Sequence, residues 1–207
     1  MLDEILFQTF LGKNPTITFI PSESDRTRKY YQKLANWYSQ FTPVNLLYFD
    51  LGEEYDPGSE SRTFSSDAIY LSGGDTRRFL QALRQRGFDT KLCDYVSGGG
   101  TLIGTSAGSI LMCPNINITV LDPNHATPPL ADMSALDLVS FEFYPHLNWN
   151  PVQGKKDVTA YSKQTDSCIY ACNDGDGIIV DGDRIKLIGD VMQVQDGTVS
   201  YPNTRFM

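Results

Sequence analysis

The stretch that decides the fold runs from residue 98 to residue 112 and reads Gly-Gly-Gly-Thr-Leu-Ile-Gly-Thr-Ser-Ala-Gly-Ser-Ile-Leu-Met. Three glycines lead into the apolar residues 101–103, whose composition predicts a buried strand. The apolar residues after Gly108 predict the start of a helix. A buried strand that passes through a tight turn into a helix is typical of a parallel α/β sheet.

The turn itself, residues 104–108, matches the pattern Gly-x-Ser-x-Gly. In a nucleophile elbow the serine occupies a strained strand-to-helix turn, and the flanking glycines let the neighbouring backbone approach closely. The alternative is a glycine-rich turn whose serine only caps the following helix. The predicted strand before the turn and the predicted helix after it favour Ser106 as a catalytic nucleophile.

The same alternation of strand and helix continues on the N-terminal side of this stretch. Short apolar runs at residues 16–20, 45–50 and 68–71 predict strands, and residues 26–41 and 77–87 carry apolar side chains at helical spacing. Residues 5–11 also have a helical pattern. These segments predict an α/β fold with a mostly parallel sheet and helices on both faces.

The last third of the chain changes character. Apolar runs at residues 141–144, 169–171, 178–180, 185–188 and 191–194 are separated by Asp-Gly pairs at 174–175, 181–182 and 196–197. Asp-Gly suits tight hairpin turns, so we expect an antiparallel extension at this end. The chain contains no repeat or linker, and we expect one domain over residues 1–207.

A nucleophilic serine needs a base, and the chain has only two histidines, His125 and His146. His146 directly follows the predicted strand 141–144, a normal position for a catalytic side chain in an open α/β sheet. His125 lies in a polar loop. We therefore expect His146 to be the base.

The base in turn needs a carboxylate that holds its tautomer. The acids between the serine and His146 are Asp122, Asp132, Asp137 and Glu142. Asp137 and Glu142 lie within apolar patterns and are interpreted as structural, whereas the pattern does not decide between Asp122 and Asp132.

An oxyanion hole needs two backbone N–H donors. One is expected from Ala107, which follows the nucleophile, and Gly74 in the turn after residue 71 can supply the other. The alternative for that second turn is a glycine turn in which Asp75 or Thr76 caps the next helix.

Residues 70–112, together with Cys113-Pro114, residues 135–138 and Pro145-His146, strongly resemble the peptidase E family of serine peptidases. The resemblance covers residues 16–146. Members of that family are similar in fold to class I glutamine amidotransferases. The resemblance implies Ser106 as nucleophile, His146 as base and Gly74 and Ala107 as oxyanion donors. Asp122 is the match for the triad aspartate, with Asp132 as the fallback.

The resemblance also implies a substrate class, because family members cleave short peptides and the aspartyl dipeptidases among them use a basic group beyond the histidine. Here only Lys155, Lys156 and Lys163 follow before Arg184, so a strict preference for an N-terminal aspartate is not implied. We expect a small peptide substrate and no cofactor or metal. The alternatives are an esterase or amidase on a non-peptide substrate and a non-catalytic homologue.

Composition limits the possible partners and the compartment. The 17 basic and 25 acidic residues give a net charge of −8, which disfavours nucleic acid as a partner. No apolar stretch approaches the length of a membrane helix, and residues 1–14 do not resemble a signal peptide. Four cysteines in a chain of this size are interpreted as reduced. We expect a cytoplasmic monomer or homodimer without membrane contact.

Overall fold

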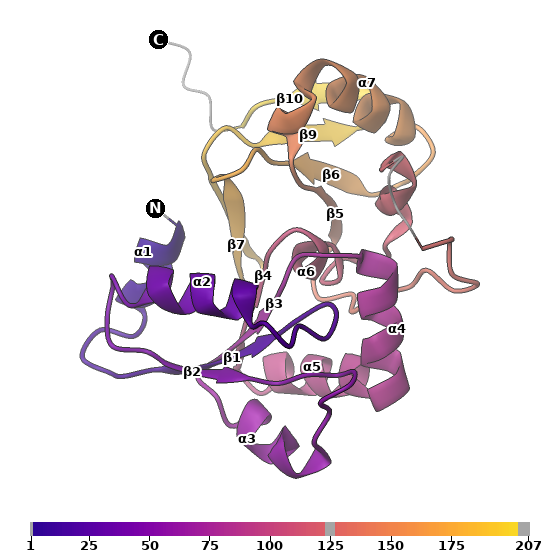
Figure 1. Cartoon of the computed structure of the whole chain (residues 1–207). Helices are drawn as coiled ribbons and strands as arrows, with labels where there is room; N and C mark the ends of the chain where they lie inside the picture. Colours follow the sequence, from indigo (N-terminus) through magenta and orange to yellow (C-terminus); the bar gives the residue numbers. More distant parts are fainter. Residues whose placement is uncertain (1, 123–126, 203–207) are drawn as a thin grey trace.

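A four-stranded parallel sheet forms the first half of the molecule (Figure 1). The computed structural model describes residues 2–122 and 127–202. The strand order is β2-β1-β3-β4, in which β1 is Thr16–Ile20, β2 is Asn45–Tyr48, β3 is Ala68–Leu71 and β4 is Thr101–Gly104. All four strands lie where the apolar runs predicted them.

Helices cover both faces of this sheet, as the sequence predicted. On one face lie α1 (Leu2–Gln8) and α2 (Lys29–Tyr38), whose Phe7 and Tyr38 pack in one buried cluster with Ala68. On the other face lie α4 (Thr76–Arg86) and α5 (Phe88–Ser97). Their apolar side chains form the larger core together with the opposite side of β3. This core includes Ile69, Leu71, Phe79, Leu80, Leu83, Phe88 and Leu92. Successive residues of a strand point to opposite faces, which explains why β3 serves both cores.

A second sheet has the order β10-β9-β6-β5 and lies beside the first in Figure 1. Its strands are β5 (Phe141–Tyr144), β6 (Cys168–Ala171), β9 (Met192–Gln195) and β10 (Thr198–Ser200). A separate hairpin consists of β7 (Gly177–Asp181) and β8 (Arg184–Ile188).

The prediction of an antiparallel end is right for β7–β8 and β9–β10. The turn of β9–β10 is the pair Asp196-Gly197, whereas the turn of β7–β8 is Gly182-Asp183, because Asp181 is the last residue of β7. The prediction is wrong for β5 and β6, which pair in parallel. A parallel pair requires a crossover, and here α7 (Pro151–Tyr161) provides it. The sequence analysis did not identify α7, whose buried side consists of only three residues, Gly154, Val158 and Tyr161.

Short elements complete the fold. They are η1 (Pro57–Ser59), α3 (Glu60–Phe64), α6 (Ala107–Ile110), η2 (Asn117–Leu121) and η3 (Leu147–Trp149).

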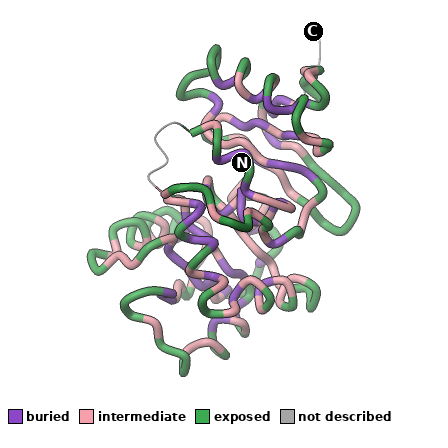
Figure 2. The backbone as a smooth tube through the Cα atoms, turned by 90° about the vertical axis from the view of Figure 1, so that its right-hand side faces the viewer, coloured by how far each residue is buried: buried purple, intermediate pink, exposed green. Residues whose placement is uncertain are grey.

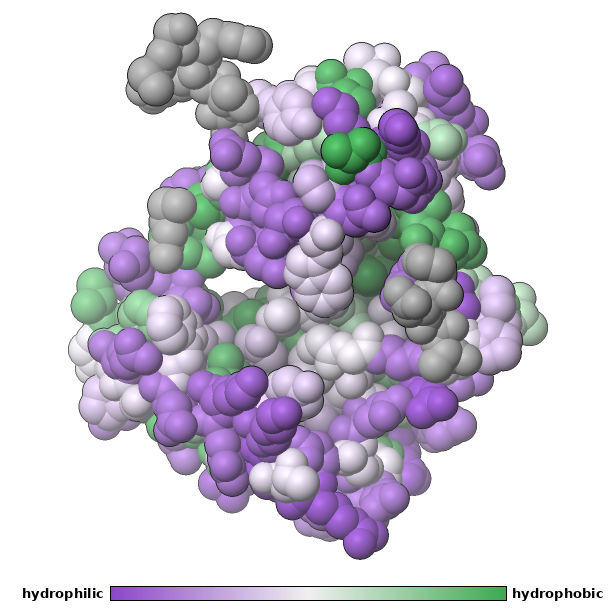
Figure 3. All heavy atoms as spheres, turned by 45° about the horizontal axis from the view of Figure 1, so that its top comes forward, coloured by the Kyte–Doolittle hydropathy of each residue, from purple (hydrophilic) through white to green (hydrophobic). Residues whose placement is uncertain are grey.

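Burial follows the strands and the inner sides of the helices, and exposed residues follow the loops (Figure 2). The face shown in Figure 3 is mainly hydrophilic, with hydrophobic residues in small groups. Within residues 2–122 and 127–202, no helix is both long and apolar enough to cross a membrane.

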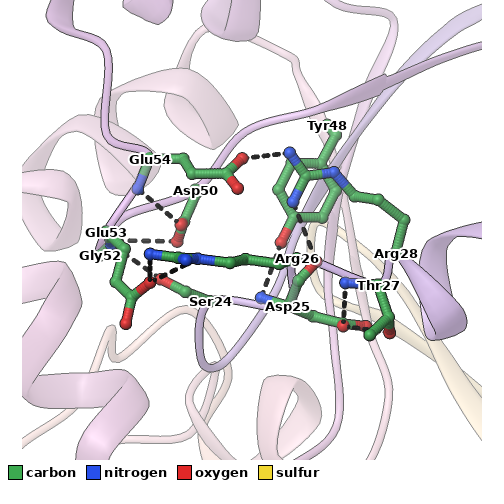
Figure 4. Close-up of polar contacts among 10 residues, drawn as sticks. All are labelled: Ser24, Asp25, Arg26, Thr27, Arg28, Tyr48, Asp50, Gly52, Glu53 and Glu54. Carbon is green, nitrogen blue, oxygen red and sulfur yellow. Dashed lines mark hydrogen bonds and ion pairs between the residues drawn. The ribbon is translucent and has the colours of Figure 1, made fainter.

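Two arginines in the loop after β1 are paired with acids in the loop after β2 (Figure 4). Arg28 stacks over the ring of Tyr48 at 3.6 Å from its centroid and forms an ion pair with Glu54. Arg26 forms an ion pair of 2.7 Å with Glu53. The positive charges of these two arginines are therefore already matched by carboxylates.

Candidate active site

Ser106 lies at the tight turn between β4 and α6. Its backbone has φ 52° and ψ −111°, a conformation that side-chain-bearing residues rarely adopt. The strand and the helix predicted on either side of it are both present. Because α6 has only four residues, backbone N–H groups rather than a long helix dipole provide the local positive potential.

The two glycines of the Gly-x-Ser-x-Gly pattern allow this turn to form. A Cβ atom on Gly104 would lie 2.6 Å from the carbonyl of Gly108, and a Cβ atom on Gly108 would lie 2.2 Å from the carbonyl oxygen of Leu71. Both distances are far below normal contact. The backbones of β3, β4 and α6 therefore approach closely only because neither position has a side chain.

His146 follows β5 directly and reaches Ser106 across the end of the sheet. Its Nε2 lies 2.9 Å from Ser106 Oγ, although the two residues are 40 positions apart. The residue has φ 60° and ψ 31°, in the left-handed region. The sequence prediction that pairs His146 with Ser106 agrees with this geometry.

The other ring nitrogen of His146 contacts an acid that the sequence analysis did not consider. Nδ1 lies 2.6 Å from Oδ1 of Asp174, in the loop between β6 and β7. Asp174 also accepts a hydrogen bond of 2.7 Å from Trp149 Nε1, and its own N–H donates to Asn148 Oδ1 at 2.8 Å. One carboxylate thus joins the loop after β5 to the loop after β6.

Hydrogen bonds determine the ionisation of Asp174. Partial burial acts to raise the pKa of this carboxyl, but the bonds from His146 and Trp149 outweigh it and hold the pKa below its usual value. The ionised carboxylate can only accept hydrogen bonds, so Nδ1 of His146 carries the proton. Nε2 then presents its lone pair to the hydroxyl of Ser106.

All three residues lie just after the last residues of strands, β4 in the first sheet and the paired strands β5 and β6 in the second. Ser106 follows β4, His146 follows β5 and Asp174 follows β6, and functional groups of open α/β sheets gather at such carboxyl ends of strands. The two later loops are also tied together, because Cys172 N–H donates to Tyr144 O and Leu147 N–H donates to Cys172 O, both at 2.9 Å.

The carboxylate beside His146 is therefore neither Asp122 nor Asp132, and the sequence expectation needs correction. The carboxylate of Asp132 lies 2.9 Å from the guanidinium of Arg84, a residue of α4. Asp122 is an exposed residue at the end of η2. The sequence analysis searched between the serine and the histidine, whereas the acid that contacts the histidine comes after it.

The one sequence signal at Asp174 is the pair Asp174-Gly175, which was interpreted as a hairpin turn. β6 and β7 do not pair with each other, so this turn serves a different purpose from the hairpin turns at residues 182–183 and 196–197. An Asp-Gly pair with a tertiary partner looks the same in sequence as one without.

The two predicted oxyanion donors lie on turns next to Ser106. A Cβ atom on Gly73 would lie 3.4 Å from Ser106 Cβ, and Gly108 N–H donates to Ser72 O at 3.1 Å, so the turn after β3 packs against the serine. Gly74 has φ 140°, a conformation that glycine tolerates. Within the described residues, neither Gly74 N–H nor Ala107 N–H donates a hydrogen bond to a protein acceptor.

The remaining sequence candidates lie outside this group. His125 falls in residues 123–126, outside the described part of the chain. Lys155, Lys156 and Lys163 line a cleft of about 770 Å³ beside α7, and the residues around this cleft include neither Ser106 nor His146.

The cysteines are free thiols in the structure, and burial raises the pKa of Cys113 and Cys172 to about 12. Over residues 2–122 and 127–202 no group of three or more His, Cys, Asp or Glu side chains is arranged to hold a metal ion.

Comparison with known proteins identifies the family of this chain. Residues 2–188 match the profile of Peptidase family S51. The chain belongs to peptidase family S51.

Relatives of this S51 chain include proteins from several bacteria. An uncharacterised peptidase of Listeria monocytogenes is 29% identical over 82% of this chain and 84% of its own length. An uncharacterised peptidase of Pasteurella multocida is 32% identical over 68% of this chain and 70% of its own. Peptidase E of Streptomyces coelicolor is 30% identical over 63% of this chain and 55% of its own.

Solved structures show the same fold. A crystal structure of a candidate peptidase E protein from Listeria monocytogenes superposes with a TM-score of 0.71 at 27% identity, over 89% of this chain and 91% of that one. A peptidase from an actinobacterium superposes with a TM-score of 0.65 at 17% identity, over 97% of this chain and 89% of that one, which shows the fold alone. The S51 chain has the class I glutamine amidotransferase-like fold, and it is a serine peptidase.

Proposed function

We propose that this S51 peptidase cleaves short peptides through Ser106, His146 and Asp174, with the backbone N–H groups of Gly74 and Ala107 as oxyanion donors. The observation that carries the proposal is the continuous hydrogen-bond chain from Ser106 Oγ through the imidazole to Asp174, with links of 2.9 and 2.6 Å. Relatives named peptidase E support the peptide substrate.

The proposed reaction begins when Ser106 Oγ attacks the peptide carbonyl and its proton moves to His146 Nε2. The oxyanion that forms is stabilised by the two N–H donors, each contributing ~3 kcal/mol in comparable sites. His146 then gives its proton to the leaving amine, the C–N bond breaks and an acyl-enzyme remains. Water, activated by the same imidazole, hydrolyses the ester and restores Ser106.

Three arginines in or just after the loops that follow β1 and β3 are already paired with acids, which argues against a strict preference for an acidic N-terminal side chain. Arg26 and Arg28 are paired with Glu53 and Glu54, and Arg78 is 3.0 Å from Glu23. An acidic substrate side chain would compete with these carboxylates for the same three arginines. With a chain charge of −8, long-range attraction does not offset that cost.

The test is Ser106→Ala against a panel of dipeptides with Asp, Glu and neutral N-terminal residues, with matched esters as a second panel. We expect Ser106→Ala to lower kcat by at least about 10³-fold on neutral dipeptides without changing the circular dichroism spectrum. Ser61→Ala, an exposed serine of α3, is the matched control and keeps full activity. Full activity of Ser106→Ala would refute the proposal, and cleavage of esters alone would favour an esterase.

A further inference from the structure

Trp149 lies on His146 in a way that the catalytic proposal does not by itself require. The ring centroids of the two side chains are 3.9 Å apart and the rings are 20° from parallel. His146, in its left-handed conformation, directly precedes the 3₁₀ turn η3, and Trp149 is the last residue of that turn, so the chain folds back and brings the two side chains together. Trp149 N–H donates to His146 O at 3.0 Å, which closes the turn.

The same indole also holds the partner acid of His146. Trp149 Nε1 donates to Oδ2 of Asp174 at 2.7 Å, while Oδ1 of that carboxylate faces His146 Nδ1. Each oxygen of Asp174 therefore has its own nitrogen donor. One side chain fixes the plane of the imidazole by stacking and the orientation of the carboxylate by a hydrogen bond.

Exposure argues against a packing role for this tryptophan. Trp149 is 71% exposed and does not belong to either buried cluster of the molecule. A large aromatic ring left in solvent gains little from burial, so its two directed contacts account for its position.

We propose that Trp149 is a positioning residue of the catalytic histidine, holding the imidazole toward Ser106 and stabilising the imidazolium that forms during the reaction. This inference rests on the proposed function, because it assigns a role within the same site. A positive ring stacked on an indole gains cation–π stabilisation, which is greatest when the histidine is charged.

Few ionisable groups in the described part of the chain lie near His146, so its protonation can be followed through Trp149. Within the described residues, the imidazole of His146 hydrogen-bonds to the carboxylate of Asp174 through Nδ1 and to the hydroxyl of Ser106 through Nε2. The next ionisable groups in the same loop are Cys172, which is buried, and Asp176, whose carboxylate bonds to Asn173. Asp174 also bonds to the indole, but its pKa is held below its usual value, so its titration falls at more acid pH. A pH-dependent signal from Trp149 above that range is therefore expected to report on His146.

The first test is spectroscopic and needs no substrate. The chain has two tryptophans, so Trp37→Phe leaves Trp149 as the sole one. Trp37 lies on α2, where it bonds to Asp3. In Trp37→Phe we expect Trp149 fluorescence to be quenched as pH falls, with the midpoint at the acid limb of the kcat/KM profile. Adding His146→Gln is expected to abolish the transition. A fluorescence signal that does not respond to pH, or one that persists without His146, overturns the stacking.

The second test is kinetic and uses two substitutions of Trp149. Trp149→Leu removes the stack and the hydrogen bond, and we expect kcat to fall by about tenfold or more with little change in KM. Trp149→Phe keeps a ring over the imidazole and is expected to retain more activity. The acid limb of Trp149→Leu is expected to lie about half a pH unit below that of Trp149→Phe, because cation–π stabilisation is lost.

Wild-type kcat and an unchanged pH profile in Trp149→Leu would refute the positioning role, as would equal losses in the two variants with no shift of the limb. Trp37→Phe, assayed alongside, controls for loss of an exposed indole elsewhere. If the wild type hydrolyses no peptide, the proposed function and the positioning role both fail. The fluorescence titration still decides separately whether Trp149 stacks on His146.

Discussion

At the scale of single residues, Asp174 combines an exposed position with a set of hydrogen bonds that only the native fold provides. Its side chain is half exposed, yet it contacts His146, Trp149 and Asn148. These contacts hold an ionised carboxylate beside the imidazole. The residue therefore contributes to the site and, through its lowered pKa, to the pH dependence of stability.

Asp174→Asn is expected to lower kcat by about 10³- to 10⁴-fold, because the amide favours the wrong tautomer of His146. Asp183→Asn, in the exposed β7–β8 turn, is the matched control and is expected to leave kcat unchanged. Steady-state kinetics of the two variants at pH 7 check this. An Asp174→Asn enzyme within a few-fold of the wild type would show that another group orients the histidine.

The stability of the wild type is expected to carry a pH dependence that Asp174→Asn lacks. The folded pKa of Asp174 is lowered, so the unfolded chain takes up the proton first as pH falls. The contribution is present above the unfolded value of about 3.9 and is lost as pH falls through the folded pKa. Urea unfolding at pH 7 and pH 3 measures it. The wild type is expected to lose more stability than the variant, and equal losses would contradict the assignment.

At the scale of elements, the turn between β4 and α6 depends on backbones that touch. Gly108 lies against the carbonyl of Leu71, so the end of β3 packs directly on α6. The Gly-x-Ser-x-Gly pattern predicts a turn with close backbone approach, because it encodes a local backbone shape, but it does not name the strand that approaches. The strand, the turn and the helix are all formed by neighbours in sequence.

Gly108→Ala is expected to destabilise the protein by about 1–3 kcal/mol, because the new Cβ would have to displace the backbone of β3. Gly98→Ala is the matched control: its Cβ would lie 3.4 Å from the carbonyl oxygen of Asp94, an ordinary contact. Thermal unfolding of both variants checks the difference. Equal melting temperatures would mean that the elbow tolerates a side chain.

Two features of the fold could not be predicted from sequence patterns, the helix α7 and the parallel pairing of β5 with β6. α7 carries polar residues around most of its circumference, and Lys155 and Lys156 lie on the side that lines the cleft. Without a clear apolar stripe the helix had no periodic signal. The parallel pairing of β5 and β6 was missed for the same reason, since that pairing depends on the crossover that α7 provides.

At the scale of the whole molecule, burial divides the four cysteines into two classes. Cys113 and Cys172 are buried, and Cys93 and Cys168 are partly exposed. Burial raises the pKa of both buried thiols to about 12, so their thiolate forms are scarce at neutral pH.

With an aromatic disulfide reagent at pH 8, we expect at most two thiols of the native protein to react quickly and all four to react in guanidinium. The absorbance of the aromatic thiolate that the reagent releases gives the number of thiols that have reacted. Cys93→Ser and Cys168→Ser identify which thiols react quickly. Burial raises the pKa of Cys93 too, so Cys93 is expected to react more slowly than Cys168. Rapid modification of all four in the native state would contradict the burial of Cys113 and Cys172.

The sequence by itself determined the α/β class and the four strands of the parallel sheet, since each depends on patterns within a few residues of chain. It also predicted the pairing of Ser106 with His146, because the chain has only two histidines and His146 follows a predicted strand. The tertiary structure alone decided that Asp174, not Asp122 or Asp132, contacts His146, and that Trp149 stacks on it. The physical reason is that these contacts form between loops at the ends of neighbouring strands. Which loops become neighbours depends on strand order, and strand order is set by how the buried faces of distant elements pack together.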